Sequence, residues 1–139
     1  MKKKGTRAER ELIHIFNNKN WGVIRSAGSG STPLPSPDIL VSNKKNLLAI
    51  ECKFIKDTKK YLNSEEIKQL TTFATKFNAI PIFAIKFQNK GWHFISPNQL
   101  EKTKQGNFRI SIEKAKSIGY SIENIEEAAK KWKQLNLQD

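Results

Sequence analysis

The sequence is poor in the residues that build disulfides, zinc sites and membrane spans. Cys52 is the only cysteine, which excludes an intrachain disulfide, and we expect it to be a small core residue. His14 and His93 have no partners at ligand spacing, so we expect surface or edge positions and no zinc site. No apolar run approaches the length of a membrane span, and none follows the basic start. We therefore expect a soluble, cytoplasmic protein that does not enter a membrane.

Acidic residues are also scarce. Thirteen Asp and Glu face 25 Lys and Arg, which gives a net charge of +12 spread along the chain. Such a surface favours a polyanionic partner, although lysine-rich surfaces also serve solubility. A chain of 139 residues can bury the core of one domain. We expect a single domain over residues 1–139, with a basic arm at 1–5 and a frayed tail at 133–139.

Hydrophobic periodicity and turn residues indicate eight elements. Strands are predicted at 21–25, 39–41, 47–55, 80–87 and 92–95, and helices at 6–18, after the Asn63 and Glu66 capping signature, and after a Ser121 cap. Residues 26–37 are rich in proline, glycine and serine and are expected to form a long loop, which is often functional. The order α-β-β-β-α-β-β-α predicts an α/β domain with a central mixed five-stranded sheet flanked by helices.

Three charged side chains belong to two neighbouring predicted strands. Side chains alternate along a strand, so Glu51 and Lys53 share one face of the strand 47–55. The short strand 39–41 can lie beside it, with Asp38 at its mouth. The spacing therefore predicts that two carboxylates and one amine meet around one point.

This combination of side chains is typical of a metal-dependent phosphodiesterase. A divalent ion neutralises the phosphate and activates water, and Mg²⁺ prefers carboxylate oxygens while keeping several waters. Asp38 and Glu51 fit that need, with the main-chain carbonyl of Cys52 as a third ligand. Lys53 has three possible roles: orienting the water, deprotonating it, or stabilising the transition state. The alternative is an ordinary solvated strand face with a turn aspartate.

Further candidates have a structural explanation beside the functional one. Glu9 is expected to form a capping box with Thr6, yet it borders the buried stripe of the predicted helix and could reach the sheet. Ser29 is either a flexible polar residue or a phosphate contact. Arg10 and Arg25 are either solvated charges or phosphate contacts, and the place of Arg25 at a strand end favours contact.

Several segments together form a more specific pattern. They are residues 5–13, residues 23–29, Asp38, Ile50-Glu51-Cys52-Lys53, Phe73-Ala74-x-x-Phe77, residues 85–87 and Gly91-Trp92-x-Phe94-Ile95. In these segments the chain resembles the archaeal Holliday junction resolvases of the Hjc type, within the PD-(D/E)xK nuclease superfamily and its restriction-endonuclease-like fold. The resemblance covers roughly residues 5–96. The loop 26–37 is longer and richer in proline than in some members, and the part after residue 97 matches less clearly.

The resemblance implies a set of site residues. The catalytic set is Glu9, Ser29, Asp38, Glu51 and Lys53, and the Mg²⁺ ligands are Glu9, Asp38, Glu51 and the carbonyl of Cys52. The expected DNA contacts are Lys3, Lys4, Arg10, Arg25 and Ser29. Phe73 and Phe77, which by helical spacing alone are core or interface residues, are expected at the interface of a homodimer.

The activity implied by the resemblance is the resolution of four-way DNA junctions. Each subunit of the dimer makes one nick, the two nicks are symmetric, and the reaction serves recombination and repair. We expect Mg²⁺ as the cofactor, with Mn²⁺ able to substitute, and no nucleotide cofactor. Two other functions stay open: a PD-(D/E)xK nuclease acting on duplex DNA, and a junction-binding protein without activity.

Overall fold

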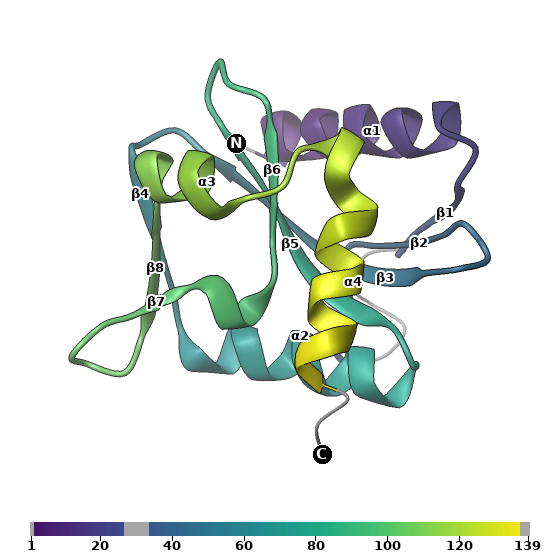
Figure 1. The fold of residues 1–139 in the computed structure, drawn as a ribbon. Coiled ribbons are helices and arrows are strands. Elements are labelled where there is room, and N and C mark those ends of the chain that lie inside the picture. The colour runs from purple at the N-terminus through teal and green to yellow at the C-terminus, as the bar shows by residue number, and fades with distance from the viewer. Residues whose placement is uncertain (1, 27–33, 137–139) are drawn as a thin grey trace.

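The computed structural model describes residues 2–26 and 34–136 of the chain (Figure 1). The helices are α1 (Lys2–Asn18), α2 (Ser64–Lys76), α3 (Ile112–Ile118) and α4 (Ile125–Asn136), with short 3₁₀ turns at Pro97–Gln99 and Ile122–Asn124. The strands are β1 (Gly22–Arg25), β2 (Ile39–Ser42), β3 (Leu47–Ile55), β4 (Lys59–Leu62), β5 (Ile80–Phe87), β6 (Trp92–Ile95), β7 (Glu101–Lys102) and β8 (Phe108–Ser111).

Five strands form the central sheet, in the order β1-β2-β3-β5-β6. β3 and β5 pair in parallel and the other neighbours are antiparallel, so the expected mixed five-stranded sheet is confirmed. β5 lies inside the sheet and is buried along nearly its whole length. Pro81 stands at the second position of this strand, where a missing N–H disturbs the ladder least.

Helices cover both faces of the central sheet. On one face α1 and α4 pack through residues such as Leu12, Phe16 and Ala129 against Leu48 and Ile50 of β3. On the other face α2 packs through its buried side chains, Leu70 and Ala74, in a cluster that holds Ala49, Phe83 and Ile85 of the sheet. Since β3 alternates faces, Glu51 and Lys53 lie on the side of α2.

A second, three-stranded sheet of order β4-β8-β7 stands beside the central one (Figure 1). We did not predict it, nor α3. β4 reads Lys-Lys-Tyr-Leu and only Leu62 is buried, so the strand carries little hydrophobic alternation. Its ladder is antiparallel to β8, with Leu62 opposite Phe108, more than forty positions along the chain.

The helix boundaries confirm one capping signature and correct two others. Asn63 and Glu66 form the predicted reciprocal capping box at the start of α2. α1 begins at Lys2, so Thr6 is inside the helix and the predicted Thr6 and Glu9 capping box is wrong. Ser121 precedes a 3₁₀ turn and makes no capping hydrogen bond, while α4 begins only at Ile125.

The two chain ends also differ from expectation. Residues 2–5, expected as a basic arm, have helical backbone within α1. α4 continues to Asn136, so the stretch from Lys133 to that residue is helical and not frayed; residues 137–139 lie outside the described part. None of the helices within the described ranges is long and apolar enough to cross a membrane.

Candidate active site

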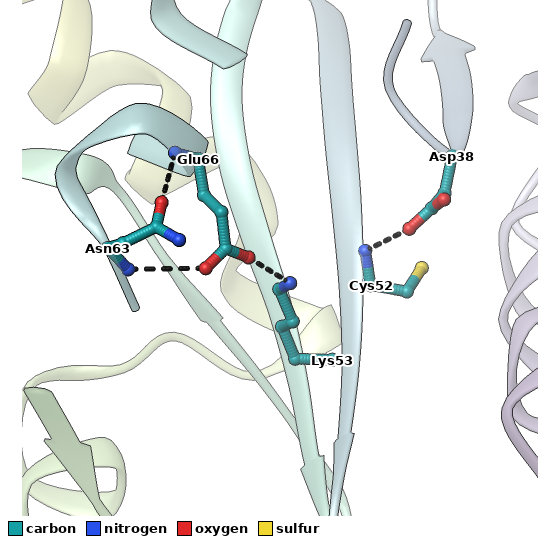
Figure 2. Close-up of polar contacts among 5 residues, drawn as sticks. All are labelled: Asp38, Cys52, Lys53, Asn63 and Glu66. Atoms are coloured by element: carbon teal, nitrogen blue, oxygen red, sulfur yellow. Dashed lines mark hydrogen bonds and ion pairs between the residues drawn. The ribbon is translucent and has the colours of Figure 1, made fainter. Parts of the chain in front are cut away.

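The two predicted carboxylates lie side by side where β2 meets β3. The antiparallel register pairs Ile39 with Ile50, so the next step along the ladder brings Asp38 beside Glu51. Oδ2 of Asp38 accepts a hydrogen bond of 2.7 Å from the main-chain N–H of Cys52 (Figure 2). This bond fixes the Asp38 carboxylate at the strand that carries Glu51 and Lys53.

Burial and repulsion by neighbouring carboxylates make both groups costly to ionise. Burial raises the pKa of Glu51 to about 7, and the negative charge of Asp38 adds to the effect. The pKa of Asp38 is also raised, first by burial and then by the charge of Glu9, against the hydrogen bond from Cys52. A cation bound between the two groups would relieve this electrostatic cost.

Glu9 reaches the same site from α1. Nε of Arg25, at the end of β1, donates a hydrogen bond of 3.0 Å to Oε1 of Glu9. Both side chains act on Asp38, whose pKa is raised by the charge of Glu9 and lowered by that of Arg25. The structure therefore brings Glu9 and Arg25 to the predicted site, while Arg10 lies exposed on α1.

The carboxylate oxygens of Asp38 and Glu51 suit a hard divalent cation. Within residues 2–26 and 34–136, no three His, Cys, Asp or Glu side chains are gathered closely enough to enclose an ion. Mg²⁺ does not require such a cage, because it is commonly held by one or two carboxylates and keeps its waters. Asp38 and Glu51 meet that requirement. The thiol of Cys52 does not take part, because burial raises its pKa well above the usual range and it packs against the core.

Glu66 is a site residue that we did not predict. Nζ of Lys53 donates a hydrogen bond of 2.5 Å to Oε1 of Glu66, in the first turn of α2 (Figure 2). Burial alone would raise the pKa of Glu66, but the hydrogen bonds from Lys53 and from the Asn63 N–H outweigh it, and the pKa is lowered. The charge of Glu66 in turn raises the pKa of Glu51. The sequence marked Glu66 only as a capping residue.

The segment before Asp38 closes one side of the site. A cavity of about 100 Å³ lies between this segment and α2; its lining is Pro35, Ser36, Pro37, Glu51, Glu66, Gln69 and Leu70. The hydroxyls of Ser26 and Ser36 are 2.8 Å apart and join the two ends of the loop. Ser29 lies outside the described residues, and so do the side chains of Lys3 and Lys4.

The predicted interface pair lies on α2. The rings of Phe73 and Phe77 stack with centroids 5.1 Å apart. Phe73 is half-buried and packs against the core on the α2 side of the sheet, whereas Phe77 is 49% exposed, so the stacked pair runs from the edge of the core to the surface.

Comparisons with known proteins agree over most of the chain. The family described as archaeal Holliday junction resolvase (Hjc) matches residues 1–134, well past the segments that carried the resemblance. The crossover junction endodeoxyribonuclease Hjc of Archaeoglobus fulgidus is 41% identical over 125 residues, 90% of each chain. The Hjc of Methanocaldococcus jannaschii is 36% identical over 137 residues, 99% of this chain and 95% of its own.

A solved structure supports the same assignment. The structure of A. fulgidus Hjc, a Holliday junction resolvase from an archaeal hyperthermophile, superposes with a TM-score of 0.79 at 38% identity, over 87% of this chain and 98% of that one. The matching fold and the carboxylate pair, with Asp38 directly before β2 and Glu51 on β3, indicate the same family. The chain belongs to the archaeal Holliday junction resolvase (Hjc) family.

Proposed function

We propose that this chain is a structure-selective DNA endonuclease that resolves four-way junctions by paired, symmetric, Mg²⁺-dependent hydrolysis of phosphodiesters. The observation that carries the proposal is the pair of desolvated carboxylates, Asp38 and Glu51, beside the ammonium of Lys53 in a chain of the resolvase family. Recombination and repair are the processes that such an activity serves. The cytoplasm is the proposed location.

The acidic residues would form the metal site. We assign Asp38, Glu51 and the main-chain carbonyl of Cys52 as ligands, with Glu9 at the border of the site. When bound there, Mg²⁺, or Mn²⁺ in its place, supplies charge neutralisation at the phosphate and a polarised water. The hydrogen bond from the Cys52 N–H holds Asp38 in place, so the protein orients this ligand before any ion arrives.

Lys53 would supply the positive charge next to the acidic pair. Its side chain is 19% exposed and extends from β3 on the face shared with Glu51. An ammonium at this point can donate a hydrogen bond to the attacking water or to a phosphate oxygen.

Basic residues around the site would hold the DNA backbone. Arg25 is 44% exposed at the end of β1 and lies next to Glu9, so it can reach a phosphate close to the cut. Arg10, Lys3, Lys4 and Ser29 are proposed as further contacts. Phosphate contacts position the substrate without reading bases, which suits an enzyme that selects branched shape.

A homodimer would place two such sites on one junction. We propose that the stacked Phe73 and Phe77 contribute to its interface, because aromatic residues are enriched in subunit contacts and Phe77 is exposed on the helix. Two identical sites related by a dyad fit a junction that is itself close to two-fold symmetric.

The direct test is cleavage of an immobile four-way junction labelled on each strand in turn, beside a linear duplex of the same sequence. The native chain with Mg²⁺ is expected to nick two opposite strands of the junction at symmetric positions and to leave the duplex intact. EDTA and Glu51→Gln should each abolish the nicks. Asp57→Asn is the matched control, because this exposed carboxylate follows β3 outside the site. Junction binding without cutting, or equal cutting of the duplex, would contradict the proposal.

A further inference from the structure

We infer that Glu66 is a positioning residue for cleavage: its carboxylate holds the ammonium of Lys53 at the site and apart from the carboxylates of Asp38 and Glu51. This inference rests on the proposed function. Glu66 would then have a second role, in the reaction, beside its role in capping α2.

Without Glu66, the Lys53 ammonium would be attracted to the carboxylates of Asp38 and Glu51. The lysine side chain is long and flexible, and its charge is near enough to lower the pKa of both Asp38 and Glu51. Without a competing acceptor, the ammonium would pair with these two carboxylates and occupy the place of the cation. Glu66 provides the competing acceptor, at 2.5 Å from Nζ.

The carboxylate of Glu66 is itself held firmly. Its Oε2 accepts a hydrogen bond of 3.2 Å from the main-chain N–H of Asn63. The main-chain N–H of Glu66 donates a separate bond of 2.8 Å to Oδ1 of Asn63, which caps the helix. The helix behind it is fixed against the sheet by its buried side chains, Leu70 and Ala74. Figure 2 shows the resulting chain of contacts, from Asn63 through Glu66 to Lys53. An anchor built on a rigid helix can hold a catalytic side chain accurately.

The capping role alone does not account for this geometry. Capping uses one oxygen of Glu66, Oε2, whereas the other oxygen, Oε1, accepts from Lys53. The neighbouring Glu65 has the same chemistry and lies in the same helical turn, but its Oε1 accepts from Gln69 at 3.4 Å. The chain therefore contains a matched pair of glutamates, and only one of them contacts the lysine.

Glu66→Gln separates the two roles. Glutamine is also a capping-box residue, so the side-chain oxygen can still accept from the Asn63 N–H. The amide nitrogen then faces Lys53, and it cannot accept a hydrogen bond from an ammonium. We expect the single-turnover rate of junction cleavage at saturating enzyme to fall about 10- to 100-fold, with junction affinity within about twofold of the native chain, because misplaced catalytic groups lower rates steeply. Glu65→Gln should keep the native rate.

Two further measurements separate positioning from folding. Asn63→Ala removes the capping side chain but keeps the main-chain N–H that donates to Oε2 of Glu66, so the anchoring of the carboxylate should survive. This variant should have a lower melting temperature, yet its cleavage rate well below that temperature should stay within about threefold of the native rate. By NMR, the Lys53 ammonium protons of the metal-free protein, assigned by their loss in Lys53→Met, should be protected from exchange in the native chain and in Glu65→Gln but not in Glu66→Gln.

The outcomes are distinct. A Glu66→Gln protein that cuts as fast as Glu65→Gln would overturn the inference, and so would an Asn63→Ala protein that slows as much as Glu66→Gln. Unprotected Lys53 protons in the native chain would overturn it as well. If the native chain does not cut the junction at all, the proposed function itself fails, and this inference fails with it.

Discussion

Oδ2 of Asp38 accepts a hydrogen bond of 2.7 Å from the main-chain N–H of Cys52. A predicted metal ligand is thus bonded to the backbone of the strand that carries the other ligand, Glu51. The position of the Asp38 carboxylate relative to β3 is therefore set by the ladder between β2 and β3 together with this hydrogen bond. The chain holds two like charges together although burial raises the pKa of both.

Asp38→Asn is expected to separate cutting from binding. The asparagine oxygen can still accept from the Cys52 N–H, so the local fold should persist, but one negative ligand is lost. Junction cleavage should fall on the order of 100-fold or more, as for other losses of a charge-stabilising group. Junction affinity, measured in EDTA by gel shift, should stay near the native value because the basic residues remain. Full activity in this variant would remove Asp38 from the metal site.

Glu51→Gln should stabilise the metal-free protein at neutral to alkaline pH. The pKa of Glu51 is raised from 4.5 to about 7 in the folded chain, so the protonated group favours folding below 4.5 and this benefit is lost as pH rises through about 7. Glutamine removes the cost of ionisation. The variant should gain ~2 kcal/mol above the folded pKa, allowing for the part of the side chain that water reaches.

The measurement is urea unfolding of both proteins in EDTA, on either side of the Glu51 pKa. The difference in unfolding free energy between variant and native chain should grow with pH, because other titrating groups cancel in the comparison. A difference that does not change with pH would show that Glu51 is ionised in the folded chain without a cost.

Phe73 and Phe77 together should control the oligomeric state. Replacing both by alanine removes the stacked pair, and sedimentation should then show a monomer or a weaker dimer than the native chain forms. Tyr61→Ala is the control, because Tyr61 is 51% exposed on β4, close to the 49% of Phe77, but belongs to the small sheet. A double variant that dimerises as tightly as the native protein would place the interface elsewhere.

Arg25→Ala should weaken junction binding in a salt-dependent way. Loss of one phosphate contact reduces the slope of log affinity against log salt by about 1. Arg109→Ala is the matched control. Arg109 is 41% exposed and ion-paired with Glu101, much as Arg25 is 44% exposed and ion-paired with Glu9. Equal effects of the two variants would indicate general charge in place of a contact at the site.

Much of the fold was predictable because the signals are local. The alternation in residues 47–55 predicted β3 with its correct bounds and faces, and the Asn63 and Glu66 signature located the start of α2. The Thr6 and Glu9 pair matched the same signature and was wrong, since α1 begins a turn earlier. A capping pattern shows where a helix can begin, whereas tertiary packing decides which of the possible start positions is used.

The second sheet was not predictable for a related reason. β4, β7 and β8 are two to four residues long and mostly exposed or half-buried, so they have little hydrophobic period to detect. β4 exists because β8, far along the chain, supplies its hydrogen-bond partners. Nothing in residues 59–62 alone encodes that pairing.

The sequence by itself determined the family and the face of β3 on which Glu51 and Lys53 lie, because residue type and strand alternation are properties of short segments. Only the tertiary structure decided that Glu9 pairs with Arg25, that Lys53 pairs with Glu66, and that burial raises the pKa of Glu51 to about 7. Each of these depends on how separate elements pack, and packing distances and desolvation are set by the whole fold.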